Sequence, residues 1–430
     1  MQAQIYRYLP SEQEFFSMQD GDAKHIFRVT LSAPNMSLKN QIRKLLIVGG
    51  ITSIGHVLSL FLYPVSIRYL SPEEVVAVGL IDSTALLIIS ILGFGLNATG
   101  TRDIALTDKW KDVLENIQSA RISLALLCSA VGLVWLVLDI GRTEIGYLLI
   151  AAPVISLNYD FALYGLGKPE AAAIVSFVRQ TFPLVLFLLL AVAGMAHPNH
   201  YLLLVVIFLF ISSWLVSKQA DASLFYAPSI TFIKVYYSVL LLGISGVFLI
   251  YQRFGFINTV ESRISSDDFI YLVTSLKLLL FIVACKRLLI QVYYPQLVDE
   301  KMTRILNAFS FFMAIGFLAV CWLFTEQFSQ LFFNDSYGGD YVMLIGFGTC
   351  ALLLFAVSDA KLLLNRQDKW MIMSTLICGL IFSGAVFFGG DVFKKGSDYL
   401  SFLIGIELLM SLSYRAGLYV SGRSFSKAKQ

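Results

Sequence analysis

The sequence predicts an all-α membrane protein of about twelve transmembrane helices, arranged as two six-helix halves around a central cavity. Hydrophobic residues make up 57% of the chain and charged residues only 14%. A chain this apolar cannot bury its apolar surface in one soluble core, and we therefore expect it to lie in a lipid bilayer. Apolar segments of roughly 20 residues, the length that crosses a bilayer, recur along the chain, and features of the first half recur in the second.

The apolar segments define the predicted helices and domains. They are residues 45–64, 75–96, 119–138, 145–165, 171–194, 200–217, 236–256, 268–290, 305–325, 341–362, 370–388 and 399–418. They group into an N-terminal half (41–217) and a C-terminal half (236–420), joined by a polar linker (218–235) and followed by a short tail (421–430).

Residues 1–40 are a polar tail without the apolar core of a cleavable signal peptide. Either residues 1–35 form a cytoplasmic tail, or the true start is Met36, which opens a short basic leader before the first segment. We favour the second interpretation.

Basic residues indicate the orientation, because Lys and Arg concentrate in cytoplasmic loops. Alternate loops carry most of them, and the loops between hold only Arg68, Arg142, Arg253, Arg263, Lys394 and Lys395. This bias places both termini in the cytoplasm, as an even number of spans requires.

Two pairs of segments indicate an internal repeat. The exit of the first helix (Arg68–Glu74) is similar to that of the seventh (Arg263–Asp268), and the end of the fourth (Asp160–Lys168) to that of the tenth (Asp359–Arg366). Each pair lies about 195 to 200 residues apart. Two halves of equal topology imply a pseudo-twofold axis along the membrane normal, with a substrate cavity between them.

Two connections have an amphipathic pattern. Apolar residues recur at helical spacing at Trp110, Val113, Leu114 and Ile117, and again at Leu297, Met302 and Ile305. This pattern predicts helices lying in the membrane interface, and a solvated loop is the alternative.

Ionisable residues deep in apolar segments are the candidate functional groups, because each costs roughly 2.5 to 3.5 kcal/mol to insert. Four lie near the predicted midplane: Asp82, Arg179, Lys277 and Glu407. Arg179 and Lys277 come from different halves, and two cations facing one cavity suit a pyrophosphate. In the alternative interpretation, each cation is neutralised by Asp82 or Glu407.

Other charged groups have predicted roles as well. Asp82 and Glu407 are candidates for proton or sodium coupling, and His56 is a weaker one. No other cofactor is expected. Cysteines fall inside apolar segments without metal or disulfide spacing, no nucleophile triad or phosphate loop stands out, and the net charge of +3 gives no reason to expect nucleic acid.

One stretch carries a family resemblance. Gly93-Phe-Gly-Leu-Asn-Ala-Thr-Gly-Thr-Arg-Asp-Ile-Ala105 ends the second predicted helix, where Asn97, Thr99 and Thr101 can bond freed backbone groups and Arg102 lies at headgroup level. It resembles the block that ends the second helix of O-antigen flippases of the Wzx type, within the superfamily that also holds drug/cation antiporters. Weaker similarities lie at Tyr63, Pro64, Arg68, Leu70, Glu73, Gly79, Asp160, Phe161, Gly165, Lys168, Tyr294 and Pro295. At 162–164 the chain lacks the family's usual aromatic pair and Gln.

The resemblance implies a flippase of the bacterial inner membrane. Its substrate would be an undecaprenyl-pyrophosphate-linked O-antigen repeat unit, moved to the periplasmic leaflet by alternating access, with membrane lipids and polysaccharide polymerase machinery as partners. Arg102, Asp160, Lys168 and Asp359 would then form a cytoplasmic gate or contact headgroups. The alternatives are a drug/cation antiporter of the same fold and, less favoured, a membrane O-antigen polymerase or other enzyme.

Overall fold

A computed structural model describes residues 68–427 apart from 106, 294–296, 298–299, 334–337, 365–366 and 391, together with a few positions between Gly50 and Val65. All regular structure in these residues is helical, which confirms the predicted all-α class. The predicted tail 1–40 and nearly all of the first predicted span lie outside the described residues, as does His56.

Helices long and apolar enough to cross a membrane match the remaining predicted segments. Within the described residues nine are continuous and two are bent pairs. The continuous spans are α4 (Pro72–Gly93), α6 (Trp110–Val137), α10 (Pro169–Val192), α11 (Pro198–Ala220), α15 (Ser266–Tyr293), α16 (Glu300–Leu323), α18 (Gly339–Leu353) with α19 (Ser358–Leu364), α20 (Asp368–Phe388) and α21 (Gly396–Lys427).

The two bent spans were predicted as straight helices. The first joins α7 (Thr143–Ile150) to α8 (Ala152–Ser156) and α9 (Asp160–Gly165) with a bend of 51°, next to Pro153, which has no amide hydrogen to donate. The second joins α13 (Leu240–Ile250) and the π-helix η2 (Tyr251–Gly255) to α14 (Ile257–Val260) and η3 (Glu261–Arg263) with a bend of 53°. A π-turn interrupts the regular hydrogen-bond ladder, which accounts for this second bend.

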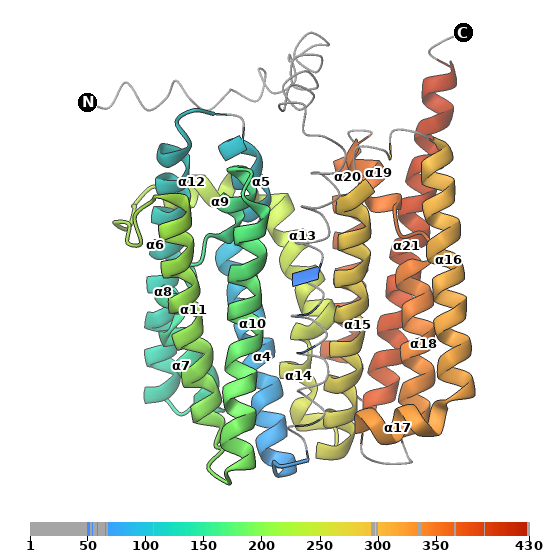
Figure 1. The fold of residues 1–430 in the computed structure, drawn as a ribbon, viewed down its shortest axis with the longest axis horizontal. Coiled ribbons are helices and arrows are strands. Elements are labelled where there is room, and N and C mark those ends of the chain that lie inside the picture. The colour runs from blue at the N-terminus through green and yellow to red at the C-terminus, as the bar shows by residue number, and fades with distance from the viewer. Residues whose placement is uncertain are drawn as a thin grey trace. The chain divides into compact units, whose positions relative to one another are not determined.

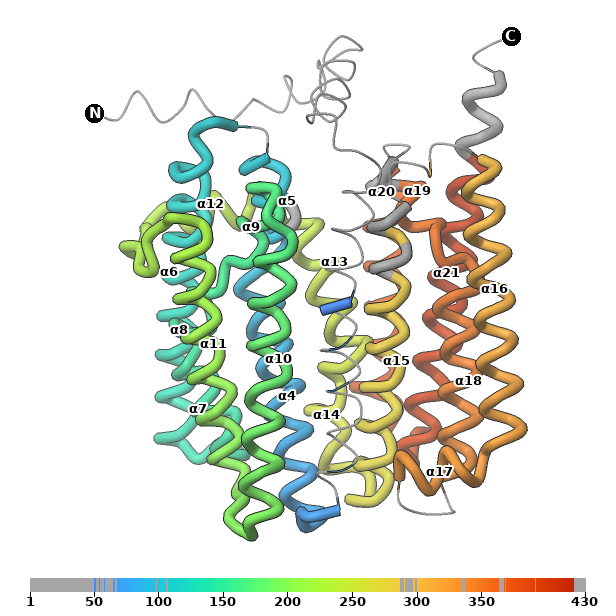
Figure 2. Tube along the Cα trace, in the orientation of Figure 1, coloured from blue at the N-terminus to red at the C-terminus, as the bar shows by residue number. Residues whose placement is uncertain are grey.

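Helices of each predicted half pack mainly with one another (Figure 1). In the N-terminal half α6 contacts α7 and α8, and α10 contacts α11; in the C-terminal half α16 contacts α18, and α18 and α20 contact α21. Helix α4 also contacts α13, α14 and α15 of the other half. The chain trace in Figure 2 shows α4 beside these helices. The structure thus identifies α4 as the main connection between the two sets of helices.

The two predicted interfacial helices are wrong. Residues 110–117 are the first turns of α6, and residues from 300 onward are the first turns of α16. No helix-breaking residue separates these amphipathic turns from the apolar turns that follow. Leu114 and Ile117 are buried inside the protein, whereas Ile305 is 52% exposed. Both stretches are continuous with spans and do not form separate surface helices.

The Gly93–Ala105 stretch forms a tight turn between two helices. Helix α4 ends at Phe94, whose backbone is left-handed, and Gly95 continues this conformation before α5 (Leu96–Ala105). The predicted hydrogen bonds are present for two of the three side chains: the Thr101 hydroxyl donates to the carbonyl oxygens of Asn97 at 2.8 Å and Phe161 at 3.2 Å, and the Thr99 hydroxyl donates to the Gly95 carbonyl at 3.4 Å. The Asn97 side-chain oxygen has no hydrogen-bond partner in the described part of the chain. This turn therefore ties α5 to α9.

Gly100 gives a stability prediction for this contact. A Cβ atom at position 100 would lie 2.7 Å from Phe161 Cε2 and 2.8 Å from Ile117 Cδ1, whereas a Cβ at Gly316 in α16 meets nothing within 4 Å. We expect Gly100→Ala to destabilise the protein by about 1–3 kcal/mol through overpacking. Gly316→Ala should be neutral or slightly stabilising, because Ala favours a helix over Gly. Thermal unfolding in detergent tests this difference, and equal unfolding temperatures for the two variants would refute it.

Candidate functional site

Charged side chains inside the helix bundle form a set of ion pairs. Among the described residues, four pairs have both side chains no more than 30% exposed. They are Arg179–Asp160, Arg253–Glu407, Lys277–Asp82 and Lys286–Asp359. The four charges predicted near the midplane all belong to this set. Pairing lowers the cost of placing each charge in an apolar surrounding.

The pair in the N-terminal half joins α9 and α10. Arg179 Nη1 lies 3.1 Å from Asp160 Oδ2, and the two side chains are 20% and 23% exposed. Asp160 occupies the first turn of α9, where the helix dipole favours a negative charge, and its backbone N–H donates to Asn158 Oδ1. Arg179 is therefore paired with Asp160, and the alternative that pairs it with Asp82 or Glu407 is wrong. Its guanidinium remains partly accessible.

Arg121 is a second cation in this half, at the start of the predicted segment 119–138, and was not among the predicted site residues. It is 1% exposed on α6. Its Nη1 donates to Gln118 Oε1 at 3.0 Å and to the Asn158 carbonyl at 2.7 Å, while its Nε has no hydrogen-bond partner. No carboxylate among the described residues forms an ion pair with it. The cluster of Arg121, Asp160 and Arg179, which we call the N-half cluster, therefore carries an excess positive charge.

Asp82 and Lys277 connect the two halves. Lys277 Nζ on α15 donates to Asp82 Oδ2 on α4, and the two side chains are 14% and 20% exposed. The Tyr201 hydroxyl of α11 donates to the other carboxylate oxygen at 2.5 Å. Lys277 is therefore paired with Asp82, as the alternative interpretation predicted.

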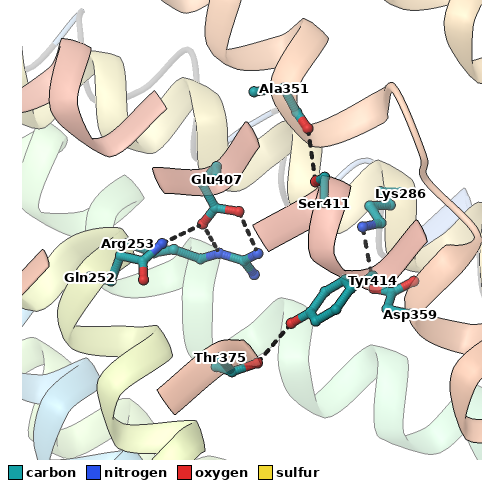
Figure 3. A network of polar contacts seen from close by, with 9 residues as sticks. All are labelled: Gln252, Arg253, Lys286, Ala351, Asp359, Thr375, Glu407, Ser411 and Tyr414. Carbon is teal, nitrogen blue, oxygen red and sulfur yellow. Dashed lines mark hydrogen bonds and ion pairs between the residues drawn. The ribbon is translucent and has the colours of Figure 1, made fainter. Parts of the chain in front are cut away.

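Glu407 belongs to a network within the C-terminal half (Figure 3). Arg253 binds its carboxylate with two hydrogen bonds, Nε to Oε1 at 2.7 Å and Nη2 to Oε2 at 3.0 Å. Gln252 Nε2 donates to the same carboxylate at 3.3 Å. Arg253 was expected in an external loop, but its side chain is only 15% exposed and lies in the π-helix η2. Its position near the end of a predicted segment was the only signal for this role.

Asp359 also pairs within the C-terminal half, with Lys286 of α15 at 3.2 Å. Figure 3 places this pair beside Tyr414, whose hydroxyl shares a 2.7 Å hydrogen bond with Thr375 Oγ1. Helices α9 and α19, which carry Asp160 and Asp359, lie at the same end of the bundle (Figure 1). The two carboxylates predicted as repeat equivalents therefore each hold a cation of their own half.

Two cavities border charged groups. A small cavity of about 20 Å³ beside Arg253 and Glu407 is otherwise lined by apolar residues of α15, α18 and α21 and by Gly348. A groove of about 320 Å³ between α10 and α11 borders Lys168, whose Nζ donates to the Gln219 carbonyl at 2.7 Å. Neither cavity is lined by Arg179 or Lys277. Arg102 is an exposed residue paired with Asp103.

No family model and no curated protein matches the sequence. Several solved structures match the fold. A multidrug resistance MATE family transporter of the MOP superfamily aligns in an inward-facing conformation over 88% of this chain and 98% of its own, with TM-score 0.60 and 14% identity. An outward-facing structure of such a transporter aligns over 90% and 95%, with TM-score 0.56 and 15% identity.

A third match is a MOP superfamily transporter from Pyrococcus furiosus, reported with a binding pocket of reverse polarity that suggests a different function. It aligns over 90% of this chain and 96% of its own, with TM-score 0.58 and 16% identity. These matches show a shared fold, while membership of the superfamily and the narrower resemblance to O-antigen flippases remain predictions. The chain therefore has the fold of the MATE family transporters of the MOP superfamily.

Proposed function

We propose that this chain is an alternating-access transporter that flips an anionic, lipid-linked polysaccharide precursor across a bacterial inner membrane. The fold supports the transport part of the proposal, because its full-length matches are transporters in inward-facing and outward-facing conformations. An enzyme is disfavoured, because the full-length structural matches are transporters. Both termini would lie in the cytoplasm, as the loop charges predict.

The observation that carries the choice of substrate is the excess positive charge of the N-half cluster. Arg179 is partly exposed, and its guanidinium binds a carboxylate oxygen of Asp160. A phosphate oxygen could occupy the place of that carboxylate oxygen. Arg121 adds a second guanidinium without a carboxylate of its own. An undecaprenyl pyrophosphate headgroup would replace Asp160 at Arg179. Lys277 would provide the cation from the other half, as the sequence analysis proposes.

Coupling would use carboxylates that change partner during the cycle. Asp82 and Glu407 are both held by cations in this structure, so either would gain affinity for a proton or a sodium ion when its cation moves away. Lys168 would contact lipid or substrate headgroups at the groove that it lines, and Arg102 would do so from the exposed last turn of α5. The polysaccharide polymerase machinery would receive the flipped product.

A drug/cation antiporter is the second candidate, and the comparisons favour it. Two of the matched structures are multidrug resistance transporters. A cationic drug would need unpaired acidic side chains, whereas Asp82, Asp160, Asp359 and Glu407 in the described part of the chain each hold a basic side chain. The polarity of the site therefore separates the two candidates.

Two assays with one plasmid test the proposal. Expression in a strain that lacks its own O-antigen flippase should restore long-chain surface polysaccharide, seen on silver-stained gels. Expression in a strain without multidrug exporters should leave its tolerance of cationic drugs unchanged. Drug tolerance that rises without any surface polysaccharide would replace the flippase proposal with the antiporter. The empty plasmid and an unrelated flippase of known substrate serve as controls.

A further inference from the structure

We infer that Asp82 and Lys277 form a charged latch between the two halves, and that an anionic substrate group releases it by taking over Lys277. The two residues lie 195 residues apart and form an ion pair across the halves. This separation equals the offset of the internal repeat, about 195 to 200 residues. Asp82 and Lys277 therefore occupy equivalent positions on α4 and α15. Equivalent positions can touch only at the pseudo-twofold axis that relates the halves.

Backbone geometry brings the two helices close at this point. Gly79 lies one turn before Asp82, and a Cβ atom there would be 3.3 Å from Phe269 Cε1 and 3.3 Å from Val273 Cγ2. A side chain at position 79 would require the Phe269 and Val273 side chains to shift by a few tenths of an ångström, so the two backbones approach closely here. The ion pair thus sits beside a tight helix contact, where a small separation of the halves would break it.

Neighbouring contacts between the halves are polar and can be exchanged. The Ser83 hydroxyl donates to the Phe254 carbonyl of the π-helix at 3.2 Å, and the Thr84 hydroxyl donates to Asn258 Oδ1 at 3.2 Å. Asn258 Nδ2 donates to Ser83 Oγ at 2.9 Å. Water can replace such neutral hydrogen bonds when helices part, so each contributes little to holding the halves together. The ion pair is the stronger contact of this region.

The charge on Lys277 makes release depend on a new partner. Separating α4 from α15 would leave a mostly buried ammonium group without its carboxylate, which is costly in an apolar surrounding. A phosphate group of the substrate would supply the missing negative charge. This step rests on the proposed function, and it explains how an empty transporter would stay latched while a loaded one opens. Tyr201 would keep Asp82 in place after release, because it holds the other carboxylate oxygen.

Disulfide formation between α4 and α15 tests the latch in purified protein without substrate. Gly79→Cys and Val273→Cys would be placed in a background in which Cys128, Cys285, Cys321, Cys350 and Cys378 are replaced by Ala. We expect Asp82→Asn to lower the ratio of closed to open protein by about tenfold, the effect of 1.4 kcal/mol on an equilibrium, and so to slow the initial rate of disulfide formation. The exchange Asp82→Lys with Lys277→Asp should restore the rate. Ser83→Ala, which removes two neutral hydrogen bonds from the same helix, should lower the rate less than Asp82→Asn does.

Further arms test release and opening. Farnesyl pyrophosphate should lower the rate in the protein with native Asp82, and farnesol, which lacks the charge, should not. The completed disulfide should stop transport, and a reductant should restore it. Two outcomes would overturn the latch. The first is an Asp82→Asn protein that elutes as a monodisperse peak and forms the disulfide as fast as the parent. The second is normal transport by the disulfide-locked protein. No response to farnesyl pyrophosphate would overturn release by substrate. If only the flippase proposal is wrong, the rates of disulfide formation measured without substrate should still be those expected for the latch.

Discussion

Arg179→Gln is expected to abolish export of surface polysaccharide while the protein still inserts in the membrane at normal levels. The variant keeps hydrogen-bonding capacity but removes the charge that would bind a pyrophosphate. Arg179→Lys should retain only a small part of the activity, because an ammonium group cannot bind two phosphate oxygens in the planar, bidentate manner of a guanidinium. Lys277→Arg should impair export less, since a cation at that position acts as a point charge. Gel analysis of surface polysaccharide and immunoblots of membranes measure the two quantities.

Arg142→Gln is the matched control for this prediction. Arg142 also pairs with a carboxylate, Glu261, but its side chain is 39% exposed and lies outside the N-half cluster. We expect near-normal export, because exposed ion pairs contribute little.

A second variant separates substrate binding from structural pairing at Arg179. If Arg179 only neutralises Asp160, then Arg179→Gln combined with Asp160→Asn should restore export, because no uncompensated charge remains. If Arg179 binds substrate, the double variant should remain inactive although it folds as well as the parent. Full rescue would therefore remove Arg179 from the proposed substrate site and leave it a structural residue.

The sequence predicted the helices well because hydrophobic length alone determines whether a segment can cross a membrane. It missed the bends, since the π-helix at Tyr251–Gly255 has no distinctive sequence pattern. Amphipathic spacing was also misleading at residues 110–117, because the same pattern describes a surface helix and the first turns of a span whose apolar face packs inside the protein. Resolving that ambiguity requires the position of neighbouring helices.

Charge pairing was the less predictable part of the site. Depth in an apolar segment identified Asp82, Arg179, Lys277 and Glu407, and each has a charged partner in the structure. The partners Arg253 and Asp160 lie near segment ends, where hydropathy cannot distinguish a loop charge from a buried one. Arg121, which also lies near a segment end, was missed for the same reason. Which carboxylate meets which cation depends on helix packing across many residues. Only the Asp82–Lys277 pair has a sequence correlate, the offset of the repeat.

Glu407→Leu is expected to be the most destabilising single change in the C-terminal half. The Glu407 side chain is 6% exposed, and its carboxylate accepts two hydrogen bonds from Arg253 and one from Gln252. Leucine would leave the buried Arg253 guanidinium without a counter-charge, which costs about 3–5 kcal/mol. Thermal unfolding in detergent, followed by the loss of the monodisperse peak in size-exclusion chromatography, measures this cost. Glu300→Leu, which removes an exposed ion pair with Arg304, should cost no more than about 1 kcal/mol.

The double variant Arg253→Met/Glu407→Leu decides what the pair does for the fold. Both charges leave together, and the replacements are apolar residues suited to a site bordered by leucine, isoleucine and valine side chains. We expect most of the lost stability to return, because replacing a buried ion pair by apolar side chains is often neutral or stabilising. A double variant as unstable as Glu407→Leu would contradict this and would assign the loss to Gln252, whose side-chain carbonyl already lacks a partner. A stable double variant that no longer transports would instead show that Arg253 and Glu407 serve the transport cycle and are dispensable for folding.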